Sequence, residues 1–82
     1  MKTEETLRIV VFRSEDMLVA QCLEYDICTQ ANDIDTLKER MDCLIEVELG
    51  EGQPIDAAPE RFHKMWDHAV GMAGGHEYRM AA

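Results

Sequence analysis

The sequence predicts an α+β domain: a three-stranded antiparallel sheet, an amphipathic helix, a second C-terminal helix and a short last strand. Three observations predict this order. Short runs of apolar and β-branched residues, separated by polar breaks, occupy residues 7–31. Apolar residues then recur at intervals of three and four over residues 34–49, the period of a helix. A similar spacing returns over residues 59–72.

The first strand is expected over residues 7–13, with Leu7, Ile9 and Val11 on one face. Val10 and Phe12 then point to the other face. A polar turn at 14–16 leads into a second strand over 17–23, and a break at 24–26 leads into a third over 27–31. Connections this short make neighbouring strands antiparallel.

The first helix is expected to begin after Asp33, whose carboxylate can accept a hydrogen bond from an N–H of the first turn. Gly50 and Gly52 are expected to end it. One helix covers only one face of a sheet, so the opposite face needs a second cover. The apolar stripe comprises Ile34, Leu37, Met41, Leu44, Ile45 and Leu49.

The second helix is expected to begin at Pro59, after a linker over residues 53–58. Its end is assigned to Gly71, Gly74 and Gly75, and residues 76–80 would form the last strand. The single domain, residues 1–82, therefore divides into a core over 7–49 and a C-terminal helix and tail over 53–82. The apolar stripe of this helix comprises Phe62, Met65, Trp66, Ala69 and Met72.

The net charge of −9, from 17 acidic and 8 basic residues, makes a basic protein the natural partner. It argues against direct nucleic-acid binding and against an anionic membrane surface. No apolar run approaches the roughly 20 residues of a membrane span. The three cysteines are odd in number and the N-terminus is polar, without a signal peptide. We therefore expect free thiols and a cytoplasmic protein.

A small metal- or thiol-dependent enzyme is one alternative, resting on His63, His68, Cys22, Cys28 and Cys43. A zinc site needs convergent ligands, whereas His63 and His68 are five residues apart and so lie on different faces of a helix. A nucleophilic cysteine needs a positioned base. We expect no catalytic residue, no cofactor and no metal, and cysteines that act as small apolar side chains.

The aromatic face of the second helix has two interpretations. Phe62, Met65 and Trp66 are residue types that anchor protein interfaces, but they can equally close the core of their own chain. A chain this short buries a small core, which a second subunit would extend. A homo-oligomer is therefore expected, with these three residues in self-association or in the core.

The segment from Leu18 to Ala31 resembles the HicB family of antitoxins. That family has a strand with a V-A-x-x-P-E-L-P-G-C-like segment, then a polar break and an acid-capped amphipathic helix. The resemblance covers residues 7–49, but Tyr25-Asp26 replaces the family's P-G turn. Residues 50–82 offer one clear helix, a possible strand and no basic recognition face, so the C-terminal DNA-binding module of many members is not expected here. The matching features are Val19-Ala20, Leu23-Glu24, Cys28 and Asp33.

The resemblance implies a β-β-β-α fold and a stand-alone partner-binding domain. In such antitoxins this domain covers a small basic toxin with a double-stranded-RNA-binding-like fold and prevents mRNA cleavage. The expected partner-binding residues are acids of the first helix: Glu39, Asp42 and Glu46. The same residues would also be expected on a helix face that is simply exposed to solvent. The remaining alternative is an orphan self-associating structural or regulatory domain that kept the fold and lost the toxin.

Overall fold

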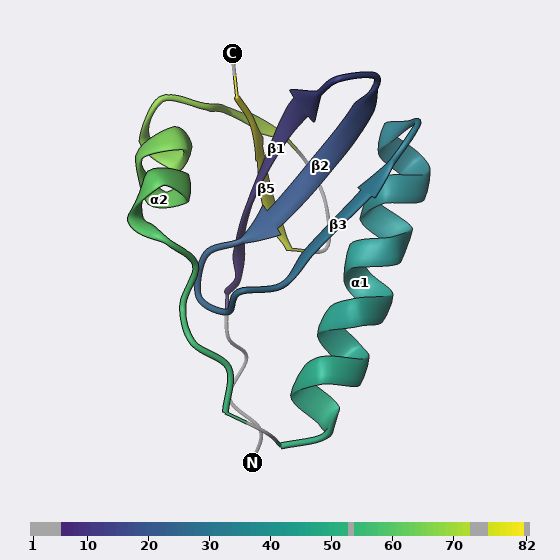
Figure 1. Ribbon diagram of the computed structural model, residues 1–82, viewed down its shortest axis with the longest axis vertical. Helices are drawn as coiled ribbons and strands as arrows, with labels where there is room; N and C mark the ends of the chain where they lie inside the picture. The colour runs from purple at the N-terminus through teal and green to yellow at the C-terminus, as the bar shows by residue number, and fades with distance from the viewer. Residues whose placement is uncertain (1–5, 53, 73–75, 82) are drawn as a thin grey trace.

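Two helices enclose a single sheet in the computed structural model, which describes residues 6–52, 54–72 and 76–81. The helices lie on opposite sides of the sheet, so the molecule has three layers (Figure 1). The predicted α+β class is confirmed. The elements, in chain order, are β1 (Arg8–Ser14), β2 (Met17–Cys22), β3 (Cys28–Ala31), α1 (Ile34–Gly50), α2 (Glu60–Asp67), β4 (Val70–Met72) and β5 (Glu77–Met80).

The sheet has five strands in the order β3-β2-β1-β5-β4, so the predicted three-stranded antiparallel sheet is wrong in its extent. The strands β1, β2 and β3 do pair antiparallel, with Val11 opposite Ala20 and Ala20 opposite Thr29. However, β5 pairs parallel to β1, with Ile9 opposite Tyr78. This pairing joins the two ends of the chain, and a strand as short as β5 carries no local signal of its partner.

The turn between β1 and β2 sets the register of the sheet. Ser14 pairs with Met17, which leaves Glu15 and Asp16 as a two-residue turn. Glu15 has φ of 57°, the positive value that tight hairpin turns require. Because side chains alternate between faces, this register places the apolar residues of both strands in two separate sets.

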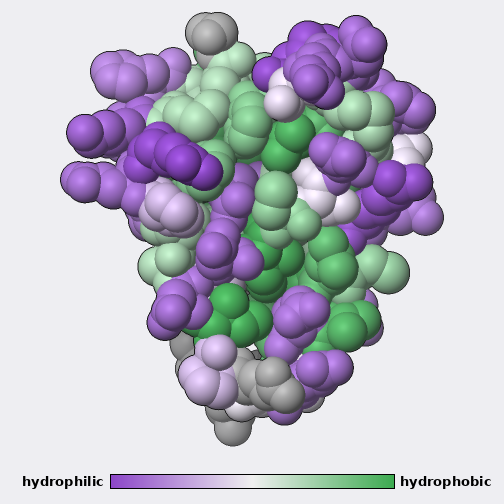
Figure 2. Space-filling view, in the orientation of Figure 1, coloured by the Kyte–Doolittle hydropathy of each residue, from purple (hydrophilic) through white to green (hydrophobic). Residues whose placement is uncertain are grey.

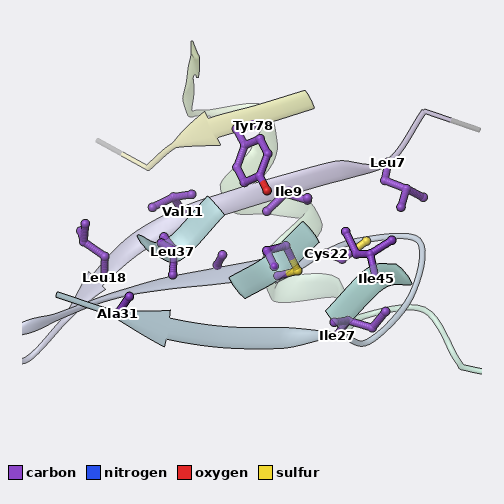
Figure 3. Close-up of a cluster of buried hydrophobic side chains, with 12 residues drawn as sticks. Leu7, Ile9, Val11, Leu18, Cys22, Ile27, Ala31, Leu37, Ile45 and Tyr78 are labelled. Carbon is purple, nitrogen blue, oxygen red and sulfur yellow. The ribbon is translucent and has the colours of Figure 1, made fainter. Parts of the chain in front are cut away.

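The main core lies between the sheet and α1, where the predicted face of β1 meets Leu37, Met41 and Ile45 of the helix. Figure 3 shows these side chains projecting from neighbouring strands toward the helix, with Tyr78 of β5 above Ile9. The predicted N-cap is confirmed, because Asp33 Oδ1 accepts a 2.8 Å hydrogen bond from the Thr36 N–H. The residues that the sheet and its flanking positions contribute to this core are Leu7, Ile9, Val11, Leu18, Ala20, Cys22, Ile27, Ala31 and Tyr78.

The opposite face of the sheet is covered by α2, which supplies the second cover that the sequence requires. Trp66 is 6% exposed and packs with Val10 and Leu23. Phe62 stacks on Phe12 of β1 with ring centroids 5.9 Å apart. The second helix therefore packs within its own chain.

The predicted extension of the second helix to Met72 is wrong. Instead, α2 ends at Asp67, and the next residues form β4, antiparallel to β5. The β-branched Val70 and then Gly71 favour extended backbone over helix, and β5 offers an edge with which they pair. Gly74 and Gly75, which were also assigned to the helix end, lie outside the described residues. The other element ends lie within one residue of the predicted ones.

Candidate protein-binding surface

An acidic stripe follows the outer side of α1. Its members are four, three and four residues apart, so they share one side of the helix, away from the buried Leu37, Met41 and Ile45. All are exposed. The stripe brings together all three acids that the sequence assigned to partner binding, and it adds one in the first turn. It comprises Asp35, Glu39, Asp42 and Glu46.

The C-terminal end of α1 carries more negative charge than helix electrostatics favour. Backbone carbonyls make this end of a helix partially negative, and a nearby cation stabilises it. Here Glu46 and Glu48 lie near the end, Glu51 is the C-cap, and the last turn contains no basic residue. The sequence therefore places like charges together where an opposite charge would be stabilising.

Asp42 differs from the other members of the stripe, because it is bound within the chain. The Tyr78 hydroxyl donates a hydrogen bond to Asp42 Oδ1 at 3.3 Å, and His76 Nε2 lies 3.2 Å from the same oxygen. Burial, and then the Asp42 charge, raise the pKa of Tyr78 above its ordinary value. Asp42 therefore ties α1 to β5, whereas Glu39 and Glu46 form no salt bridge within the described residues.

Two recesses run along the flank of α1 that faces β3, and Glu39 of the acidic stripe lines one of them. They have volumes of about 220 and 370 Å³ and meet at Leu44, which lines both. We call them together the β3 groove. Figure 2 shows apolar side chains gathered in the middle of this view of the molecule, with hydrophilic ones on both sides. The lining comprises Asp26, Ile27, Cys28, Thr29, Glu39, Arg40, Cys43, Leu44, Glu48 and Ile55.

Sequence reasoning missed this groove, although one signal for it was present. Only Asn32 and Asp33 separate β3 from α1, so the helix must turn back and run beside the strand that it follows. That turn brings Cys28 near Glu48 and Thr29 near Cys43. The composition of the groove, however, depends on which residues α1 turns toward the strand edge, and this follows from core packing.

The three residues of α2 that the sequence assigned to self-association or to the core pack against their own sheet. Trp66 is buried, and the guanidinium groups of Arg79 and Arg8 lie 4.3 and 5.9 Å from its ring. Phe62 and Met65 are half-buried against it. These side chains are therefore committed to α2 packing on its own sheet.

The thiols and imidazoles do not converge. Within residues 6–52, 54–72 and 76–81, no three His, Cys, Asp or Glu side chains lie together as metal ligands would. His63 Nε2 lies 3.2 Å from the Ala58 carbonyl oxygen, and His68 is exposed.

Only one of the three cysteines acts as a small apolar side chain. Cys22 is buried in the core, whereas Cys28 and Cys43 are exposed, so the expectation for these two is wrong. Burial raises the pKa of the Cys22 thiol, and partial desolvation together with the Asp26 charge raises the pKa of Cys28. A nucleophilic thiol needs the opposite shift.

No helix in the described part of the chain is both long and apolar enough to cross a membrane. Comparison of the chain with models of protein families, with curated proteins and with solved structures found no match.

Proposed function

We propose that this chain is a non-enzymatic binding module resembling a HicB-type antitoxin, which acts in the cytoplasm and neutralises a small, basic, mRNA-cleaving toxin. The observation that supports the proposal is the acidic stripe of α1. Glu39 and Glu46 are exposed there, and the described structure gives neither a salt bridge within the chain. A basic partner would match this surface.

The energetics of α1 support a cationic partner. The charges of Glu46, Glu48 and Glu51 repel one another and the partially negative helix end. A lysine or arginine of a partner near this end would relieve both effects. The surface is thus better suited to a complex with a cation than to the free chain.

The order of elements supports the family resemblance. The chain runs β1-β2-β3-α1 over residues 8–50, which is the β-β-β-α unit that the resemblance implies for a partner-binding domain. The features that carry the resemblance lie within or beside this unit. Val19-Ala20 lies in β2, Cys28 begins β3, and Asp33 caps α1.

The test is isolation of the complex from source cells with a tagged chain. We expect a basic protein in stoichiometric amount that cleaves mRNA when purified alone and is inactive when bound. A captured protein without such cleavage, or one whose cleavage the chain leaves unchanged, contradicts the proposal. Recovery of the chain alone from cells shown to express a basic RNase beside it contradicts it too.

A second candidate is an orphan domain that associates only with itself, and one observation favours it. Val70 is 66% exposed on β4, an edge strand of the sheet. Pairing of two copies along this edge would cover it. In that case Val70→Lys should convert a dimer to a monomer in analytical ultracentrifugation. Val47→Lys, which changes another large exposed apolar residue, on α1, should leave the dimer intact.

A further inference from the structure

The β3 groove lies beside an edge strand of the sheet. Among the described strands, β3 pairs with β2 and with no other. On the outer side, the Gln30 carbonyl accepts a 2.8 Å hydrogen bond from Arg40 Nη1 of α1. An extended segment entering the groove would therefore meet main-chain groups of β3 with which it can form a ladder.

The two recesses give this segment a place for its side chains. The apolar lining residues, which we call the floor, are Ile27, Leu44 and Ile55 in the smaller recess and Leu44 in the larger one. Both recesses are open and meet at Leu44, so they form a track along the strand and not an enclosing pocket for a small molecule. In an extended segment alternate side chains point the same way, so every second residue would reach the floor.

The acidic residues along the rim of the groove favour basic side chains in the bound segment. Asp26, Glu39 and Glu48 line the groove, and the basic group among the lining residues, Arg40, is already held by the strand. Asp26 is fixed in place, because its Oδ1 accepts a 2.9 Å hydrogen bond from Gln21 Nε2. Lysine or arginine side chains of the segment would be attracted to these carboxylates.

We propose that the β3 groove binds an extended basic segment of the partner protein, which joins the sheet as a strand beside β3. The inference rests on the proposed function and places part of the partner on the flank of α1 that faces β3, where Glu39 belongs to both the groove and the acidic stripe. Arg40 covers the edge in the free chain, and the incoming segment competes with it for the Gln30 carbonyl.

The test uses a short blocked peptide of alternating lysine and valine, titrated into the full ¹⁵N-labelled chain at physiological salt. A glutamate-valine peptide of the same length is the control. We expect the largest amide shifts in β3 with the lysine peptide and none with the glutamate peptide. Glu48→Lys should weaken binding about tenfold, because it replaces attraction by repulsion at the rim.

A matched variant separates the groove from general attraction to an acidic protein. Glu46→Lys makes the same charge change two residues away, on the stripe, and should weaken peptide binding about twofold or less. Arg40→Gln frees the edge and should strengthen binding. Equal losses in Glu46→Lys and Glu48→Lys, or shifts centred outside β3 and its groove, overturn the inference. A natural partner that binds while the β3 amides stay unshifted overturns it and leaves the proposed function standing.

Discussion

The Tyr78 hydroxyl donates a hydrogen bond to Asp42 across the gap between β5 and α1, so an acid on the outer side of the helix also holds the last strand. Tyr78 is otherwise part of the main core. Tyr78→Phe keeps the ring and removes this bond. We expect a loss of about 0.5–1.5 kcal/mol in the free energy of unfolding near neutral pH, measured by urea denaturation. A loss as large as that of Tyr78→Ala would show that ring packing had changed too.

The same pair predicts a dependence on alkaline pH. Burial and then Asp42 raise the pKa of Tyr78 above 10, so the folded chain keeps a proton that the unfolded chain releases. Since the folded state then binds more protons, stability falls as pH rises through 10 toward the folded pKa. The advantage of the native chain over Tyr78→Phe should therefore shrink above pH 10 in denaturation curves. A constant advantage would contradict the assignment.

Truncation of Trp66 should reduce the free energy of unfolding more than truncation of any other residue of α2. Trp66→Ala removes the ring that packs on Val10 and Leu23, and such a truncation typically costs about 3–5 kcal/mol. The expected result is a large drop in the unfolding midpoint with no change in the oligomeric state of the remaining folded protein. An unchanged midpoint with a smaller assembly in ultracentrifugation would place Trp66 in an interface between copies.

Asp33 should make the start of α1 sensitive to acid. The Thr36 N–H and then its hydroxyl lower the pKa of the Asp33 carboxyl. A lowered folded pKa contributes stability above the unfolded value of about 3.9, and that stability is lost as pH falls through the folded pKa. Asp33→Ala should lower the melting temperature at pH 7. Below pH 4 the melting temperature of this variant should decrease less than that of the native chain. Asp33→Asn keeps an acceptor oxygen, so its melting temperature at pH 7 should be higher than that of Asp33→Ala.

The three thiols should react with iodoacetamide at different rates. Cys22 is buried and should react only on unfolding, which makes it an internal control. Partial desolvation and the Asp26 charge raise the pKa of Cys28, so below pH 9 its thiolate is scarcer than that of an ordinary cysteine. Asp26→Asn removes the charge and should speed alkylation of Cys28, followed by mass spectrometry. An unchanged rate would show that Asp26 does not act on this thiol.

Local patterns predicted what local physics determines. The N-cap at Asp33, the apolar stripe of α1 and the alternating faces of β1 and β2 depend on neighbouring residues, and the structure has all of them. The pairing of β5 with β1 depends on residues at opposite ends of the chain, so no local sequence pattern can predict it. Apolar residues at helical spacing also continue through Val70–Met72, but these residues pair with β5 and form a strand.

The candidate surface was predicted in the same uneven way. Glu39 and Glu46 were predicted to be exposed because helix spacing alone places them outward, and both are exposed. Asp42 was assigned the same role, but its bond to Tyr78 follows from the strand that the sequence did not place. The β3 groove joins residues that are distant in the chain, such as Cys28 and Glu48, and it becomes visible only once α1 is packed.

The most direct measurement of the central claim compares two double variants of matched charge in binding to the purified partner. Glu39→Lys with Glu46→Lys reverses the acidic side of α1, whereas Asp16→Lys with Glu77→Lys makes the same change on the hairpin turn and on β5. We predict a loss of affinity of at least about tenfold for the first pair and about twofold or less for the second, by titration calorimetry. Equal losses for both pairs, or none for the first, would contradict a partner bound on α1.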